Sequence, residues 1–477
     1  MKIFRISLIS IIVFVANIIF ASGGNYVNSI PHLDGAELTI FWAIPFIGIL
    51  LSIAVMPLVA AHFWHNNFGK VSLFWALAFL VPFLIVEGYS VALYEFLHII
   101  LLDYIPFIIL LLALFTISGG IRLKGTLVGT PILNTIIILI GTILASWMGT
   151  TGAAMLLIRP LIRANQHREH KVHIIVFFIF LVANIGGSLT PLGDPPLFLG
   201  FLKGVNFFWT TTAMFKPMLF MVITLLLIFY YIDSRFYGLE DKSRIPVSEV
   251  KEKFGIDGSI NFLFLIGVIA SVLMSGIWKP HISFNIYNVE LSLPNIFRDI
   301  FLLILTYLSW IFTSKPVREA NQFTWFPIQE VAKLFAGIFI TIIPAIAILR
   351  AGADGALSAV INSVSSNGEP INYMYFWATG ILSSFLDNAP TYLVFFNTAG
   401  GNALELMGPL HHTLLAISAG AVFMGANTYI GNAPNFMVKS IAEEQNISMP
   451  SFFGYMLKYS IPILIPLYIL ATFIFFV

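Results

Sequence analysis

Long apolar runs alternate with short polar segments along nearly the whole chain, from about residue 39 to the C-terminus. Most of these runs reach the roughly 20 residues that an α-helix needs to cross a bilayer. The runs cover residues 39–61, 70–90, 93–118, 128–148, 151–163, 171–200, 212–232, 259–278, 294–313, 331–350, 371–386, 388–400, 412–440 and 451–476. The pattern predicts an all-α polytopic membrane protein.

Two pairs of neighbouring runs, the fourth with the fifth and the eleventh with the twelfth, have no polar loop between them. Only Gly149-Thr150 separates the first pair, and only Asp387 separates the second. Neither connection is long enough to leave the membrane. Each pair is therefore predicted to form a re-entrant hairpin, whose tip must be buried in protein or line a wet cavity.

Runs 171–200 and 412–440 are too long for a single straight crossing, and each contains a Gly/Pro-rich motif. Proline lacks an N–H group and clashes with the preceding turn, and glycine relaxes the backbone. We predict two broken transmembrane helices, unwound at 190–196 and 428–434, with a simple proline kink as the alternative. The residues predicted to break helices here and in the second hairpin are Gly193, Pro195, Pro196, Gly431, Pro434 and Pro390.

The two motifs are copies of each other, displaced by 238 positions. The shift pairs Gly187 with Gly425, Thr190 with Thr428, Gly193 with Gly431, Pro196 with Pro434, and Phe198 with Phe436. The same shift places the tip region of the first hairpin, 143–152, on that of the second, 381–390. A constant shift over two separate motifs indicates an internal duplication with a site at its centre.

Loop charges predict the orientation of the two copies. The segments on both sides of the first hairpin carry Lys and Arg, whereas those around the second, 351–370 and 401–411, carry neither. By the positive-inside rule the hairpins enter from opposite faces of the membrane. We therefore predict an inverted-topology repeat, with the first copy at 39–232, a cytoplasmic linker at 233–258 and the second copy at 259–477.

The N-terminus has its own pattern. Lys2 and Arg5 precede an apolar run from Ile6 to Phe20, which is followed by small residues. This layout is typical of a secretory signal peptide, and a short first transmembrane helix is the alternative. Residues 1–22 are assigned to one of these two.

Composition narrows the function classes. The chain has 477 residues, is 58% hydrophobic and only 10% charged, and has a net charge of +1. No basic patch suggests nucleic acid as a partner. With no cysteine, disulfides, thiolate metal sites and cysteine nucleophiles are excluded. No grouping of catalytic residues appears, so we expect neither an enzyme nor a cofactor, and the linker is too short to be a sensor domain.

Two carboxylates lie at the breaks, Asp194 and Asp387. A charged Asp at the bilayer centre costs about 2.5–3.5 kcal/mol, which a proton or a bound cation offsets. A carboxylate that must carry one or the other is the minimal device for antiport. The alternative is that each Asp caps a half-helix. The neutral oxygens nearby come from Asn388, Thr150, Thr151, Ser188, Thr190, Asn427, Thr428 and Asn432.

This oxygen-rich set suits a hard cation. We place Na⁺ at Asp387, Asn388 and Asp194 as a hypothesis, with Na⁺ as the transported or coupling ion.

At these residues the chain resembles the ion transporter superfamily, which includes NhaD-type sodium/proton antiporters, ArsB-type arsenite exporters, and sodium-coupled citrate and dicarboxylate carriers. The motif 386–390, Leu-Asp-Asn-Ala-Pro, is similar to the hairpin of the antiporter and arsenite branches. Gly193-Asp194 is similar to the NhaD-type break, and 431–435 resembles the Gly-x-x-Pro-Asn of the carboxylate branch. The resemblance implies a scaffold domain, a transport domain holding the hairpins and broken helices, homodimers, and alternating access.

The sequence departs from this pattern in two places. Neither hairpin tip carries the Ser-Asn-Thr signature of the carboxylate carriers, and Pro195-Pro196 replaces the polar run that follows Gly-Asp in NhaD-type proteins. The missing Ser-Asn-Thr signature counts against the carboxylate carriers, so we favour a sodium/proton antiporter of the bacterial inner membrane, whereas Pro195-Pro196 bears on the details of the ion ligands. The alternative is a cation-coupled carrier of citrate or another organic anion, which predicts a basic residue facing the site; Arg159 is the candidate near a hairpin.

Overall fold

The computed structural model describes residues 31, 33–241 and 253–477, so the predicted signal peptide or first helix lies outside the described residues. The helices of the first half are α2 (Ile44–Val59), α3 (Ala61–Ile99), α4 (Ile105–Ser118), α5 (Pro131–Met148), α6 (Thr150–Ala164), α7 (Val172–Leu181), α8 (Pro195–Leu202) and α9 (Phe207–Leu239). Those of the second half are α10 (Ile260–Ile277), α11 (Leu293–Phe312), α12 (Lys315–Ala320), α13 (Phe326–Arg350), α14 (Ser358–Val364), α15 (Asn372–Phe385), α16 (Asn388–Thr398), α17 (Ala403–Met407), α18 (His411–Met424), α19 (Ala433–Glu444), α20 (Phe452–Tyr455) and α21 (Ile461–Phe475).

Strands are short and lie at the edges of the helical body. They form three antiparallel two-stranded pairs: β1 (Arg122–Lys124) with β2 (Gly255–Asp257), β3 (Ser283–Ile286) with β4 (Val289–Ser292), and β5 (Ser365–Ser366) with β6 (Glu369–Pro370). Within the described residues, nine helical stretches are long and apolar enough to cross a membrane. The prediction of an all-α polytopic membrane protein is confirmed.

One of these stretches contains two of the predicted runs. Helix is continuous from Ala61 to Ser118 except at Gly88, where φ is 81° and ψ is 169°. A side chain would make this left-handed conformation costly, so glycine allows the break. The π-helix η2 (Ile100–Tyr104) joins α3 to α4 within the same stretch.

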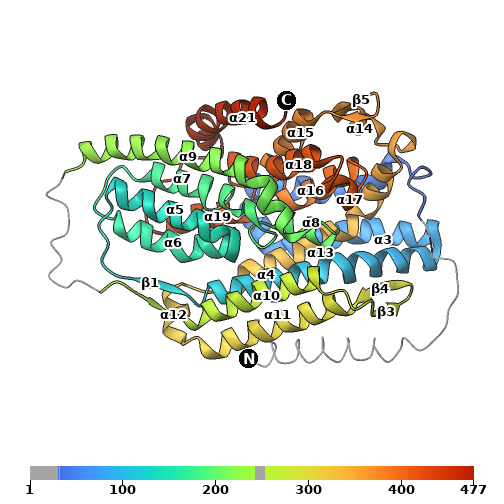
Figure 1. The fold of residues 1–477 in the computed structure, drawn as a ribbon, viewed down its shortest axis with the longest axis horizontal. Coiled ribbons are helices and arrows are strands. Elements are labelled where there is room, and N and C mark those ends of the chain that lie inside the picture. The colour runs from blue at the N-terminus through green and yellow to red at the C-terminus, as the bar shows by residue number, and fades with distance from the viewer. Residues whose placement is uncertain (1–30, 32, 242–252) are drawn as a thin grey trace.

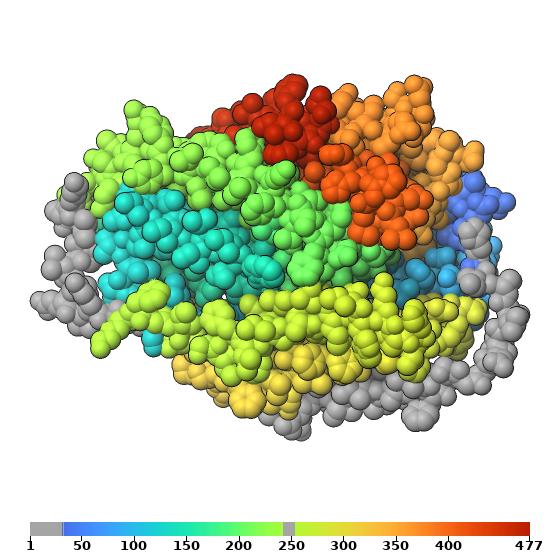
Figure 2. Space-filling view, in the orientation of Figure 1, coloured from blue at the N-terminus to red at the C-terminus, as the bar shows by residue number. Residues whose placement is uncertain are grey.

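One group of helices lies beside the hairpins as a separate layer. In it α3 packs on α2 and α13, and α11 packs on α4 and α10. Figure 1 shows α10 and α11 along the lower edge, with α5, α6 and α7 stacked at the left and α15 and α18 at the upper right. In Figure 2 the α10–α11 band runs below the cyan-to-green segments of the first half.

The first predicted hairpin is formed by α5 and α6, which pack against each other and meet at Gly149. Gly149 has φ 81° and ψ 148°, a backbone conformation that only glycine adopts readily. The second is formed by α15 and α16, which pack together and are joined by Leu386 and Asp387 in extended conformations.

The two long apolar runs are interrupted at the predicted motifs, but not with the predicted bounds 190–196 and 428–434. Helix α7 already ends at Leu181 and α18 at Met424, and Pro195, Pro196 and Pro434 lie in the first turn of the helix that follows each break. In the first, α7 is followed by the 3₁₀-helix η3 (Ile185–Leu189), and a new helix, α8, begins at Pro195. In the second, α18 is followed by η6 (Gly425–Asn427), and α19 begins at Ala433 with Pro434 in its first turn. Proline is tolerated in the first turn because the N–H group there has no partner within the helix.

Each break requires two glycines that touch. A Cβ on Gly193 would lie 2.1 Å from the carbonyl oxygen of Gly187. In the second copy, a Cβ on Gly431 would lie 2.5 Å from the carbonyl oxygen of Gly425. These four residues are two pairs of the 238-residue shift, so both copies use the same close approach to fold the unwound segment.

Hydrogen bonds between hairpin and break repeat in the same way. Thr190 Oγ1 donates to the Ser146 carbonyl, and Thr428 Oγ1 donates to the Ser384 carbonyl. The hydroxyls of Ser146 and Ser384 donate to Gly186 and Met424 respectively. Every member of one set is 238 positions from its counterpart. This repetition supports the duplication, and the opposite orientation of the copies in the membrane stays a prediction.

Part of the predicted linker 233–258 is regular structure. Helix α9 continues to Leu239, and β2 begins at Gly255. Residues 242–252, between them, lie outside the described part of the chain.

Candidate functional site

Asp194 lies at the first break, at the residue that precedes α8. Its backbone is extended, its side chain is buried, and it makes no capping hydrogen bond to α8. The carboxylate is therefore directed away from its own helix, and the capping alternative is not what the structure shows for this residue.

Side chains from the two hairpin tips and from the second helix break donate hydrogen bonds to the Asp194 carboxylate. Thr150, in the first hairpin tip, donates from Oγ1 to Oδ1 at 3.3 Å. Asn388, in the second tip, donates from Nδ2 to Oδ2 at 2.7 Å. Asn432, in the second break, donates from Nδ2 to Oδ1 at 3.1 Å and also to the Ala183 carbonyl. One carboxylate thus joins all four irregular segments of the two copies.

The partners of Asp194 carry no charge. Ion pairs of the described residues involve other acids, such as Asp103, Asp233 and Asp257, and not Asp194. Neutral donors orient an ionised carboxylate but do not neutralise it, and an unpaired charge away from water is costly. The arrangement therefore suits a group that carries a proton or a small cation.

Asp387 is placed differently. Its Oδ1 accepts from the Ala389 N–H at 3.0 Å, which makes it the N-cap of α16, and its side chain is half-buried. Capping, the predicted alternative, is observed for this residue. The next residue, Asn388, is the one that reaches Asp194, so the tip brings both acids to one region. A role for Asp387 in ion exchange stays a prediction.

The remaining predicted oxygens hold the backbone of the breaks. Ser188 Oγ donates to the Ile185 carbonyl, and Asn427 Nδ2 donates to Ser384 Oγ. Thr190 and Thr428 each accept an N–H from two residues ahead besides their bonds to the hairpins. Thr151 lines the cavity described below.

Two asparagines that the sequence analysis did not single out join the breaks to each other. Asn184 Nδ2 donates to Asn435 Oδ1 at 2.7 Å, and Asn435 Nδ2 donates to the carbonyls of Gly425 and Thr428. Asn435 lies inside the quoted Gly-x-x-Pro-Asn motif, and Asn184 lies three residues before the first motif. Their places in and beside the repeated motifs are the feature of the sequence that could have identified them.

Some buried amide oxygens around the breaks lack a donor. They are the Oδ1 atoms of Asn184, Asn388 and Asn427. Leaving a buried acceptor without a partner is costly. Amide oxygens are also ligands of hard cations, so these atoms fit a site of that kind.

A cavity of about 100 Å³ reaches the site from one side. Its polar side chains are Asp194, Thr150 and Thr151, and the rest of its wall is apolar, glycine or proline. The wall comes from the C-terminal half of α4, the N-terminal end of α13, the first hairpin tip, the first break and α19. The described lining contains no lysine, arginine or histidine.

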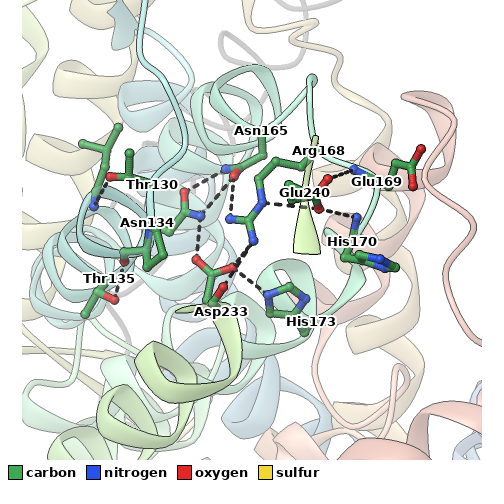
Figure 3. Close-up of polar contacts among 12 residues, drawn as sticks. Thr130, Asn134, Thr135, Asn165, Arg168, Glu169, His170, His173, Asp233 and Glu240 are labelled. Carbon is green, nitrogen blue, oxygen red and sulfur yellow. Dashed lines mark hydrogen bonds and ion pairs between the residues drawn. The ribbon is translucent and has the colours of Figure 1, made fainter. Parts of the chain in front are cut away.

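A second buried polar cluster anchors the base of the first hairpin (Figure 3). Asp233, on α9, accepts from Arg168 at 2.6 Å and from Asn134, on α5, at 3.0 Å, and its Oδ1 lies 2.7 Å from His173 Nε2. Asn134 and Asn165 exchange hydrogen bonds across the two ends of the hairpin. The cluster ties the hairpin to α7 and α9, and so fixes where the tip lies.

Glu240 closes this cluster just beyond α9. Its carboxylate accepts the N–H groups of Glu169 and His170 and lies 3.9 Å from the Arg168 Nε. Burial alone raises the pKa of Glu240, but these two N–H groups and the Arg168 guanidinium bring it below its usual value. Glu240 therefore stays ionised at neutral pH.

Comparison with known proteins identifies a family. No curated protein matches the chain. Residues 35–476 match a protein family described as "putative citrate transport". The match begins just before the first described helices and ends at the penultimate residue, so it includes both hairpin tips and both helix breaks. The chain is a multi-pass membrane protein that belongs to this family of citrate transporter-like proteins.

Proposed function

We propose that the chain is a secondary transporter of the bacterial inner membrane that exchanges Na⁺ for H⁺, with Asp194 as the exchange carboxylate. The observation that carries this proposal is that the buried Asp194, at the first helix break, accepts hydrogen bonds from uncharged side chains of both hairpin tips and of the second helix break. Such an acid is stable in the membrane when it holds a proton or a cation, and costly when it holds neither. That requirement couples the two movements.

The surrounding residues fit this role. With a proton on Asp194, the amides of Asn388 and Asn432 still orient the carboxyl group. With Na⁺, the carboxylate and the amide oxygen of Asn388, which now lacks a donor, are oxygen ligands of the kind that hard cations take. Asp387 is the residue before Asn388, and its negative charge favours the entry of a cation.

The second candidate is a cation-coupled carrier of citrate or another organic anion, and the family description favours it. An anion requires compensating positive charge. Arg159, the sequence candidate, donates to Gln322 Oε1 at 2.8 Å and is not among the residues that line the cavity. A carrier built on this site would therefore need bound cations as part of its anion site.

The test uses proteoliposomes with an interior pH dye, the wild-type chain and Asp194→Asn. A proton gradient is imposed, and Na⁺, Li⁺, K⁺ or citrate is then added separately. We expect proton movement on adding Na⁺ or Li⁺ alone, and none with Asp194→Asn. No response to cations alone, together with Na⁺-dependent citrate uptake, would replace the antiporter with the second candidate.

A further inference from the structure

An ion pair with a buried carboxylate lies at the far end of α8 from Asp194, and the proposed exchange of Na⁺ and H⁺ does not use it. Lys203 Nζ lies 2.6 Å from Asp103 Oδ2, and the side chain of Asp103 is 1% exposed. Asp103 belongs to the π-helix η2, between α3 and α4. Lys203 is the C-cap of α8. The pair therefore joins the layer of α3 and α4 to the broken helix that carries Asp194.

Helix α8 connects this pair rigidly to the site. Asp194 precedes its first residue and Lys203 follows its last, and eight helical residues between them span about 12 Å. Because a short helix moves as a rod, Asp194 cannot be displaced along the rod without displacing Lys203.

A second rod repeats this arrangement. Helix α16 packs beside α8, with Gly200 against the Tyr392 hydroxyl. Its first residue, Asn388, contacts Asp194, and near its other end Asn397 accepts from Arg350 Nε at 2.8 Å. Arg350 is the last residue of α13, on which α3 packs. Both rods thus have one end in the site and the other end bonded to the adjacent layer.

The cavity and these bonds lie at opposite ends of the layer's helices. On α13 the cavity is lined by residues from Pro327 to Val331, whereas the bonded residue is Arg350. On α4 it is lined by Leu110 to Phe115, whereas Asp103 precedes the helix. The structure therefore leaves space on one side of Asp194 and has charged contacts between the two layers on the other.

We propose that the Lys203–Asp103 pair, supported by the bond between Arg350 and Asn397, stabilises the conformation in which the cavity reaches Asp194. The pair must break before Asp194 can be reached from the opposite side of the membrane. We call this pair the latch. By the loop charges, the cavity end is predicted to be cytoplasmic. A pair that forms in one state only shifts the population towards that state. The inference rests on the chain being a transporter and not on the identity of its cargo.

The test follows access to the cavity directly. The chain has no cysteine, so Val331→Cys places one thiol on the cavity wall. Size-exclusion chromatography first shows that each variant is folded in detergent. The rate at which the thiol reacts with a polar maleimide is then measured. We expect Lys203→Ala and Asp103→Asn each to slow labelling about tenfold through loss of the cavity-bearing state. Lys203→Arg keeps the charge and should restore the rate.

A double-mutant cycle separates a latch from two independent packing effects. If the pair acts as one unit, Lys203→Ala with Asp103→Asn labels no more slowly than either single variant. The matched control is Lys439→Ala, which breaks the ion pair with Glu443 inside α19 and leaves the rate unchanged. Unchanged labelling in both single variants, slow labelling with Lys203→Arg, or additive slowing in the double variant would each overturn the latch. Because no Na⁺ or citrate is used, failure of the proposed cargo would not alter the outcome.

Discussion

The two acids at the breaks differ in what their carboxylates contact. Asp194 receives side-chain donors from segments as far as 238 residues away in sequence, whereas Asp387 accepts an N–H from a residue two positions ahead. A carboxylate held by distant segments changes its surroundings when those segments move. A local cap keeps its partner in every state. We therefore propose Asp194, rather than Asp387, as the residue that couples the two ions.

Replacing Asp387 with Asn separates its observed role as a helix cap from its proposed role in attracting the cation. Asn caps a helix about as well as Asp, so we expect the stability of the protein to change by less than about 0.5 kcal/mol. If the charge of Asp387 draws the cation in, the Na⁺ concentration for half-maximal exchange rises and the maximal rate is kept. The measurement is dye-reported exchange against Na⁺ concentration. Loss of all exchange would instead make Asp387 a second exchange carboxylate.

At the scale of elements, each break depends on a pair of touching glycines. Gly193→Ala would place a Cβ against the Gly187 carbonyl, so either the unwound segment or the hairpin beside it has to shift. We expect a loss of about 1–3 kcal/mol in stability or more, with loss of exchange. Thermal unfolding and the dye assay measure the two effects.

The matched control for this change is Gly238→Ala, near the end of α9. A Cβ there meets no atom within 4 Å, and alanine favours a helix over glycine by about 0.5–1 kcal/mol. This variant should retain exchange and be slightly more stable. Equal damage from both substitutions would contradict the role given to the close approach at the break.

The anchor of the first hairpin is also an element-scale feature. Asp233→Asn removes the nearer counter-charge of Arg168, at 2.6 Å, and leaves only Glu240, at 3.9 Å. Removing one partner of a fully buried ion pair costs up to about 3–5 kcal/mol, so we expect a clear drop in the melting temperature. Glu443→Gln, which breaks a more exposed pair on α19, should change stability by less than about 1 kcal/mol. Similar melting temperatures for the two variants would show that the cluster is not an anchor.

At the scale of the whole molecule, the site is shared between the halves. Asp194 and Thr150 come from the first half, and Asn388 and Asn432 come from the second. Fragments 1–247 and 248–477 should therefore be inactive when each is expressed alone, and active when expressed together. Exchange in vesicles measures this. Activity in vesicles that hold only the first fragment would contradict a shared site.

The helix breaks could be predicted from the sequence, whereas the contacts between distant segments could not. Gly149, Pro195 and Pro434 act through backbone chemistry that is local, so the helix breaks could be predicted from residue type and run length. The contacts of Asn388 and Asn432 with Asp194 depend on how distant helices pack, and no pattern along the chain encodes that distance. The bond between Asn184 and Asn435 went unpredicted for the same reason, and so did the pairing of Lys203 with Asp103.

The shared carboxylate also has a consequence for synthesis of the chain. Asn388 follows Asp194 by 194 residues. At about 5–20 residues per second, a ribosome needs roughly 10–40 s to add them. During that interval the first half enters the membrane with Asp194 lacking two of its three donors. The newborn first half thus holds only part of the proposed ion site, and completion of the chain, rather than insertion of any one helix, is the step that completes it.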